Sequence, residues 1–408
     1  MTIWCDLSAL VRHSGSVSGI QRAVSGLAGG LIESHGARSL RFCSFDKQSG
    51  FAALAERDVE DLLATLGAPG EADDDEQKGL LERLRHRVAR PTLRAPFAPG
   101  DLLFNPGFTT YKPKQLGEVA ALLARVAYVG FVYDLLPVLF PEWWTPVQQR
   151  RYRAWFEWSG RNASLLLCCS ESTRRDATAF FAAAGIGTGP VETLLLGDEL
   201  PRALAAQRPT AEAPAAERPF VLYVSTLEVR KNHRLLFQVW RRLIEKHGPE
   251  RIPDLVFVGR RGWLIDDFVT ELEQSRFLDG KIVWKRGVDD AELAQLYASC
   301  LFTVYPSLYE GWGLPVAEGM AFGRWCVASD TSSLPEVGGN LAGYFDPFDV
   351  PGATAAIERP ILDAGFLAEK TRAVRERFAA RSWQTSAAAL RTRLEALAAD
   401  QTGKSSAR

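Results

Sequence analysis

Short apolar runs alternate with segments of helical periodicity in the second half of the chain. Apolar residues within 232–246 recur at helical spacing, and Gly248 ends that pattern. Runs typical of buried strands lie at 220–224, 255–258, 281–284, 301–304 and 326–328. Strands that alternate with helices predict right-handed crossovers and a parallel sheet, so this half is predicted to be a Rossmann-like domain.

The first half repeats the pattern less regularly. Its predicted helices are 20–33, 146–159 and 172–184, and its predicted strands are 2–5, 40–44, 102–104, 126–132, 165–168 and 191–195. Residues 201–219 are rich in Ala, Pro and charge and lack periodicity, which indicates a linker. We expect an N-terminal domain over 1–205, a linker over 206–218, a C-terminal domain over 219–380 and a C-terminal helix over 381–400.

Composition narrows the class of protein. With 408 residues, 47% of them hydrophobic and 24% charged, the chain is long enough for two globular domains. A formal net charge of -1 argues against nucleic acid as a partner. No run reaches membrane-spanning length, and the start lacks the pattern of a signal peptide. The six cysteines lie mostly in apolar runs without a Cys-x-x-Cys pair, so we expect buried thiols in the cytoplasm, and no metal.

Residues 56–94 form a charged insert of a different character. An acidic cluster at 71–76 is followed by the basic stretch 83–90. Two interpretations stay open. The insert is either a solvated helical hairpin or a basic face that contacts anionic lipid or a lipid-diphosphate acceptor at the inner face of the membrane.

Two glutamates, Glu310 and Glu318, straddle a glycine-rich turn that precedes a predicted helix. Pro315 suits the first turn of that helix. Backbone can approach a ligand closely at the turn, and a helix N-terminus favours an anion such as a diphosphate. The turn residues are Gly311, Trp312, Gly313 and Leu314. One glutamate is then placed to accept hydrogen bonds from hexose hydroxyls and the other from ribose hydroxyls.

A basic pair, Arg230 and Lys231, follows the predicted strand 220–224 and precedes a helix. Two cations at the carboxyl end of a strand can neutralise a diphosphate and the charge that grows on it when a glycosidic bond breaks. The alternative is an ordinary basic pair at the surface. Residues 259–262 follow another strand, where they either line the nucleotide pocket or form a plain turn.

The segments around Glu310, Glu318 and the Glu-Val-Arg-Lys-Asn string at 228–232 resemble the donor-site motifs of the retaining GT-B glycosyltransferases of family 4, also called glycosyl transferases group 1. The resemblance implies an α/β GT-B fold, in which two Rossmann-like parallel-sheet domains face an interdomain cleft. It also implies that Arg230 and Lys231 contact the diphosphate. A C-terminal helix that crosses back onto the first domain is a further expectation from this family.

Three other segments carry weaker resemblances. In the family, the loop that contains Gly287 and Val288 lines the base, partly through main-chain groups. A small-residue loop that ends at Gly19 would bring backbone close to the donor phosphate or the acceptor; a plain loop is the alternative. Asp134 matches an aspartate of the family pattern, and we expect it to orient either the acceptor or the strand-end loop. Tyr133 stands where the family has a histidine, so that histidine's role is not transferred.

These features predict a hexosyltransferase that uses a nucleoside diphosphate sugar, with mannose as the guessed hexose. The acceptor would be a glycan or a lipid-linked glycan in bacterial surface polysaccharide or lipopolysaccharide synthesis. Retention of the anomeric configuration follows from the resemblance alone. We expect no cofactor, no metal and a cytoplasmic location, with peripheral membrane contact left open. Two alternatives remain: a non-catalytic sugar-nucleotide-binding scaffold, and a sugar-nucleotide epimerase or hydrolase on the same fold. The oligomeric state is not predicted.

Overall fold

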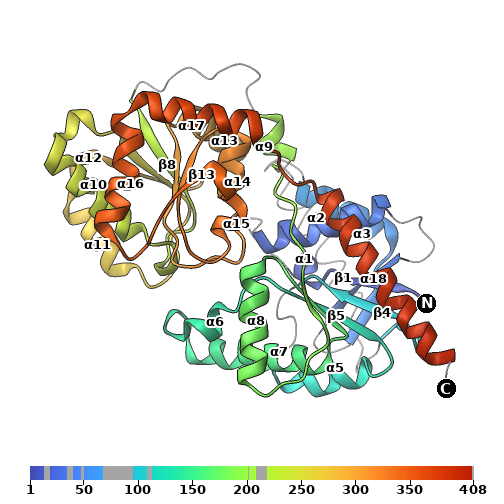
Figure 1. Cartoon of the computed structure of the whole chain (residues 1–408). Helices are drawn as coiled ribbons and strands as arrows, with labels where there is room; N and C mark the ends of the chain where they lie inside the picture. The colour runs from blue at the N-terminus through green and yellow to red at the C-terminus, as the bar shows by residue number, and fades with distance from the viewer. Residues whose placement is uncertain are drawn as a thin grey trace. The chain divides into compact units, whose positions relative to one another are not determined.

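The chain folds into two α/β units, each built on its own sheet (Figure 1). The computed structural model describes residues 1–12, 19–34, 40–46, 50–67, 95–107, 113–200, 202–207 and 218–406. The first unit comprises Met1–Gly197 and Arg381–Arg408, and the second comprises Asp198–Ala380. Residues 68–94 of the charged insert lie outside the described residues, so both interpretations of it stay predictions.

The first unit has a seven-stranded sheet in the order β3-β2-β1-β4-β5-β6-β7. Its strands are β1 (Ile3–Asp6), β2 (Leu40–Asp46), β3 (Gly50–Ala53), β4 (Leu102–Asn105), β5 (Ala127–Val132), β6 (Leu165–Cys168) and β7 (Val191–Thr193). All neighbouring pairs are parallel except β2 and β3, which are antiparallel. The sequence analysis missed β3. Only residues 47–49 separate β2 from β3, too few for the crossover that a parallel pair needs.

Helices alternate with these strands. They are α1 (Ser8–Val11), α2 (Gly19–Ser34), α3 (Glu56–Gly67), α5 (Leu116–Leu122), α6 (Leu136–Leu139), α7 (Pro146–Asn162) and α8 (Glu171–Ala183). The predicted helices in this half are confirmed. Helix α7 starts where Thr145 and Gln148 form a capping box and Pro146 occupies the first turn. It buries Trp155 and Phe156 in the core of the first unit.

The second unit has a six-stranded sheet in the order β10-β9-β8-β11-β12-β13, and every neighbouring pair is parallel. Its strands are β8 (Phe220–Val224), β9 (Asp254–Val258), β10 (Ile282–Lys285), β11 (Thr303–Tyr305), β12 (Cys326–Ser329) and β13 (Ala342–Phe345). The five strands predicted for this half are confirmed, and β13 is added at one edge of the sheet. The prediction of a Rossmann-like domain is therefore correct.

The helices of the second unit are α9 (Arg202–Ala206), α10 (His233–His247), α11 (Asp266–Gln274), α12 (Arg276–Gly280), α13 (Asp290–Ser299), α14 (Leu314–Ala321), α15 (Leu334–Gly338), α16 (Val350–Leu362) and α17 (Ala364–Arg377). The predicted domain boundary differs from the observed one, because α9 belongs to the second unit and not to the first. The reason is the packing of Leu204, which is buried with Phe220 and Tyr297 of the second unit. Most of the predicted linker, residues 208–217, lies outside the described residues.

Helix α18 (Trp383–Ser406) returns the chain to the first unit, where it packs against α2 (Figure 1). The ring of Trp383 packs directly on the backbone of Gly26 and Gly197, where any larger residue would place its Cβ atom in the ring. A Cβ atom added at Gly26 would lie 2.2 Å from this ring, and one added at Gly197 would lie 2.5 Å from it. At Gly30 an added Cβ would lie 2.6 Å from the Ala387 methyl group. Glycines on α2 therefore create the surface on which α18 docks.

Three further features of the chain bear on the expectations about cysteines, membrane-spanning helices and metal ligands. All six cysteines are buried. In the described ranges, no helix is long and apolar enough to cross a bilayer. Within those same ranges, no group of three or more His, Cys, Asp and Glu side chains is arranged to hold a metal ion.

The docking of α18 predicts opposite effects for two glycines of one helix. Gly26→Ala should lower the free energy of unfolding by about 1–3 kcal/mol, because the new methyl group overlaps the Trp383 ring. Gly29→Ala is the matched control, since no atom lies within 4 Å of its added Cβ. It should raise stability by about 0.5–1 kcal/mol through helix propensity. Urea unfolding of both variants tests this, and equal effects would contradict the docking.

Candidate donor site

The order in which the chain adds strands to the sheet of the second unit reverses between β8 and β11. From β8 the chain adds β9 and β10 on one side, and then places β11, β12 and β13 on the other side. Ligands of open parallel sheets bind at such a point, outside the carboxyl ends of the strands. The loop after β8 carries Arg230 and Lys231, and the loop after β11 carries Glu310. The structure brings the basic pair into contact with Glu310, which lies 80 positions after Arg230 and 79 after Lys231 in the sequence.

The loop after β8 is fixed by the loop after β9. The amide of Leu227 donates to the carbonyl of Arg260 at 2.9 Å, and the amide of Gly262 donates to the carbonyl of Leu227 at 2.7 Å. A Cβ at Gly262 would lie 2.7 Å from that same carbonyl oxygen, so the approach requires glycine. Beneath the loop, the Tyr223 hydroxyl donates to the carbonyl of Lys231 at 2.7 Å. Residues 259–262 therefore hold the start of the loop that carries the basic pair.

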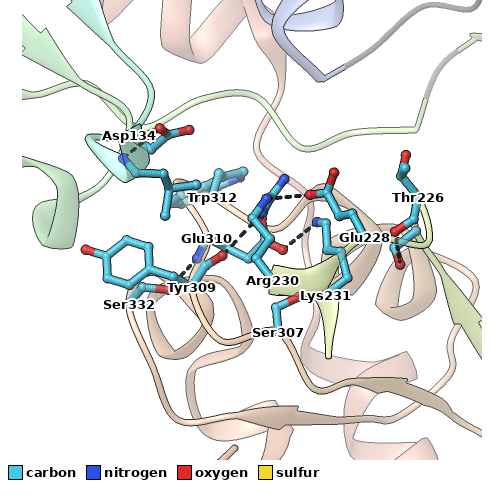
Figure 2. Close-up of polar contacts among 12 residues, drawn as sticks. Asp134, Thr226, Glu228, Arg230, Lys231, Ser307, Tyr309, Glu310, Trp312 and Ser332 are labelled. Atoms are coloured by element: carbon cyan, nitrogen blue, oxygen red, sulfur yellow. Dashed lines mark hydrogen bonds and ion pairs between the residues drawn. The ribbon is translucent and has the colours of Figure 1, made fainter. Parts of the chain in front are cut away.

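Four charged side chains form one cluster (Figure 2). Lys231 Nζ lies 2.5 Å from Glu310 Oε1 and 2.9 Å from the Tyr305 hydroxyl. Arg230 Nη1 lies 2.7 Å from Glu310 Oε2, and Arg230 Nε lies 2.5 Å from Glu228 Oε1. We call Glu228, Arg230, Lys231 and Glu310 the charge cluster. Glu228, Lys231 and Glu310 are buried, and the two carboxylates balance the two cations.

The surroundings shift the pKa values of the cluster. Burial acts to raise the pKa of Glu310, but the charges of Arg230 and Lys231 and the hydrogen bond from Lys231 overcome it and lower that pKa to about 2. Burial, and then the charge of Arg230, lower the pKa of Lys231. Burial raises the pKa of Glu228, against the opposing charge of Arg230. Glu310 is therefore the more firmly ionised of the two carboxyl groups at neutral pH.

The glycine-rich turn opens α14, as predicted. Gly313 has φ +133°, and a Cβ there would lie 2.8 Å from Leu334 Cδ2, so both conformation and space favour glycine. Gly311, Trp312 and Leu314 lie in the same turn before and at the helix start.

Glu318 is buried on α14, just over one turn from its start. It accepts a hydrogen bond from the hydroxyl of Tyr297 on α13 at 2.9 Å. An ionised carboxylate can accept further hydrogen bonds, so this contact is compatible with a second partner such as a ribose hydroxyl.

Gly287 and Val288 lie in the loop after β10, the edge strand that β9 separates from β8. Gly287 has φ +68°, and Val288 packs against the core of the second unit. Beside them, the Arg286 guanidinium stacks 3.7 Å from the centre of the Trp284 ring. Asp289 caps α13 by accepting from the amide of Glu292, and the Glu292 carboxylate pairs with Lys285 at 2.7 Å. A role for Gly287 and Val288 at the base stays a prediction.

The candidate residues of the first unit have local structural partners. Asp134 Oδ1 accepts from the amide of Leu136 at 3.1 Å, at the start of α6. The buried Tyr133 hydroxyl donates to the carbonyl of Pro106, the residue that follows β4, at 2.8 Å. Gly19 is the exposed first residue of α2, and residues 13–18 of its loop lie outside the described residues.

Sequence reasoning missed several residues that support the site. Glu228 stands in the motif string without a predicted role, and Tyr305 lies just beyond the predicted strand 301–304. The hydroxyl-rich run at 329–333 was not singled out, although it follows the strand next to β11. Its composition was the available signal, because side-chain hydroxyls pair readily with loop backbone.

Residues 207–376 match the family model described as glycosyl transferases group 1. Over these residues, the match confirms the resemblance to glycosyl transferases group 1 that was inferred from the motifs. Over 203 residues the chain is 34% identical to the O-antigen chain mannosyltransferase B of Escherichia coli, a match that covers 50% of this chain and 52% of that protein. The chain thus spans about half the length of this curated relative.

Two solved structures support the GT-B fold assignment. Sucrose-phosphate synthase from Thermosynechococcus elongatus aligns with a TM-score of 0.62 at 16% identity, covering 98% of this chain and 100% of that one. Anabaena Alr3699/HepE, in complex with UDP and glucose, aligns with a TM-score of 0.55 at 18% identity over the full length of both chains. At these identities the likeness shows the fold alone.

The charge cluster predicts a pH-dependent stability term. The pKa of Glu310 falls from 4.5 to about 2 on folding, so the unfolded chain binds more protons in this window, and stability is lost as pH falls through it. Glu310→Gln should destabilise the protein by about 3 kcal/mol at pH 7, because it leaves two cations short of a partner. The difference from wild type should shrink below about pH 4.5.

Urea unfolding at pH 7 and near pH 3 measures both quantities. Glu273→Gln, at an exposed position of α11, is the control and should change stability by less than about 0.5 kcal/mol at either pH. A destabilisation of Glu310→Gln that is the same at both pH values would contradict the ionised cluster.

Proposed function

We propose that this protein is a retaining glycosyltransferase that transfers a hexose, with mannose as the first candidate, from a nucleoside diphosphate sugar to a glycan or lipid-linked glycan. The observation that carries the proposal is the pair Arg230 and Lys231, held against Glu310 at the switch point of a glycosyl transferases group 1 domain. The mannosyltransferase relative in O-antigen synthesis supports mannose and a surface polysaccharide as product. The UDP-bound structural neighbour supports a nucleotide partner.

The proposed chemistry uses the charges of the cluster. The bond between the anomeric carbon and the diphosphate breaks, and negative charge accumulates on the diphosphate. Arg230 and Lys231 stabilise that charge because ion pairs fix them before the reaction, and Lys231 is also buried away from water. The acceptor hydroxyl attacks from the side of the departing diphosphate, which takes its proton. Two protein cations supply the positive charge, so the proposal includes no metal.

The remaining candidates receive roles that agree with their positions. Glu310 binds the hexose hydroxyls, Glu318 binds the ribose, and the 311–314 turn receives the diphosphate at the start of α14. Gly287 and Val288 stay assigned to the base. Asp134 stays assigned to the acceptor or the strand-end loop, and Gly19 to the donor phosphate or the acceptor. Peripheral contact with the inner face of a membrane stays a separate prediction.

Acceptor-dependent release of nucleoside diphosphate tests the function. GDP-mannose and UDP-glucose are each incubated with the enzyme, with and without a mannan oligosaccharide, and nucleoside diphosphate and extended glycan are measured. Transfer that requires both substrates supports the proposal. Release without acceptor would indicate a hydrolase, and conversion of the sugar an epimerase. Binding that stabilises the fold, by about 2.7 kcal/mol at 100 times the dissociation constant, without any turnover would indicate a scaffold.

Lys231→Ala should lower turnover by roughly 100-fold or more while changing the donor KM much less. The reason is that a cation facing developing charge acts most strongly in the transition state. Lys370→Ala on α17 is the matched control at a surface position and should leave turnover unchanged. Steady-state kinetics per folded molecule decides the matter. Turnover of Lys231→Ala within about threefold of wild type would remove Lys231 from the chemistry.

The two glutamates should differ in their response to free nucleoside diphosphate. Glu318→Gln should weaken binding of both the donor and the free nucleoside diphosphate, because both contain the ribose. Glu310→Gln should impair transfer without lowering the affinity for free nucleoside diphosphate. That ligand has no hexose, and Arg230 and Lys231 lose a carboxylate that competes with its phosphates. Calorimetric titration of both variants measures this. Equal losses, or a loss confined to Glu310→Gln, would overturn the assigned donor orientation.

A further inference from the structure

The loop after β12 presents its hydroxyl groups to the loop after β11. Strands β11 and β12 are parallel neighbours, with Tyr305 opposite Ala328, so their following loops leave the same edge of the sheet. We call the side chains of Ser329, Thr331, Ser332 and Ser333 the hydroxyl cradle. Ser329 Oγ donates to the carbonyl of Ser307 at 2.5 Å, and Thr331 Oγ1 lies 3.3 Å from the same oxygen.

The other two hydroxyls hold the backbone of Glu310 from both sides. The amide of Glu310 donates to Ser332 Oγ at 2.8 Å. Ser333 Oγ lies 3.0 Å from the Glu310 carbonyl and 2.5 Å from the Trp312 carbonyl, and its single proton is shared between them. Ser332 and Glu310 are both drawn in Figure 2. The charge cluster thus holds the carboxylate of Glu310, while the cradle holds its main chain.

Ser332 makes its contact from an unfavourable backbone conformation. Its φ is +53°, in the left-handed region that is unfavourable for a residue with a Cβ and readily adopted by glycine. Non-glycine residues persist in such conformations where the surrounding structure over-determines them, and they cluster at functional sites. The hydroxyl at this position satisfies the amide of a buried residue, and glycine would leave that amide without this acceptor.

We propose that Ser332 and Ser333 are positioning residues of the donor site, which align Glu310 with the hexose of the bound donor. This inference rests on the proposed function. It adds that the precision of the hexose contact comes from the loop after β12, which itself carries none of the charges of the cluster. Loss of a cradle hydroxyl should therefore misplace Glu310 and slow transfer, without removing the groups that bind the diphosphate.

Two substitutions at one position separate positioning from stability. Ser332→Gly removes the hydroxyl but adopts a positive φ readily, so relief of the unfavourable conformation offsets the lost hydrogen bond and stability should stay close to that of wild type. Ser332→Ala removes the hydroxyl and keeps the unfavourable φ, so it should be less stable than Ser332→Gly. Both should lower turnover by about tenfold or more, as misplacement of a reacting group does. Both should keep the affinity for free GDP within about twofold.

Ser275→Ala is the matched control. Ser275 Oγ donates to the carbonyl of Leu272 at 2.9 Å near the start of α12, another hydroxyl-to-backbone bond of the second unit. This variant should keep wild-type turnover. Ser333→Ala provides a second test of the cradle and should slow transfer as Ser332→Gly does.

Amide hydrogen exchange gives a readout that does not need turnover. Exchange in peptides covering 307–313 should be faster in Ser332→Gly than in wild type, because the Glu310 amide loses its acceptor. Wild-type turnover and wild-type exchange in Ser332→Gly would overturn the proposal. So would a loss of turnover that only follows a loss of stability. If wild type transfers nothing while exchange responds to Ser332→Gly, the proposed function fails and the positioning of the loop stands.

Discussion

The need to pair buried charges is the constraint on which the site depends. Glu228, Lys231 and Glu310 are buried, and an isolated buried charge costs several kcal/mol. Each therefore requires partners of opposite sign, and the loop after β8 cannot supply all of them. Glu310 comes from the loop after β11, so the cluster is complete only when these two strands lie side by side. Formation of the sheet and formation of the site are in this sense one event.

Backbone fixation serves the same site from two further loops. The loop after β9 pairs with Leu227 and sets the path of the basic pair. The loop after β12 holds the main chain of Glu310 through hydroxyl groups. Four neighbouring strands, β9, β8, β11 and β12, thus contribute to one arrangement. Rigid strands with short fixed loops suit an enzyme in which charged groups must be in place before the reaction begins.

Connectivity links the two units through chain crossings near 197 and 381. The second crossing allows α18 to complete the first unit, and glycines at 26, 30 and 197 provide the surface for Trp383 and the first turns of α18. The family resemblance implied such a returning helix, and an Ala-rich and Arg-rich composition placed it near the end of the chain. Neither indicated which surface it would meet.

Local sequence determined most of the strands and helices and the chemistry of the donor motif, because hydrophobic period, glycine, proline and charge act over a few residues. It identified Arg230, Lys231 and Glu310, and the two motifs matched one family. Tertiary structure decided the rest. Which strands are neighbours is set by long-range pairing, so the contacts of Lys231 with Glu310 and of Ser332 with the Glu310 amide have no local signature. The place of 198–206 in the second unit depended likewise on the burial of Leu204, which only the assembled core provides.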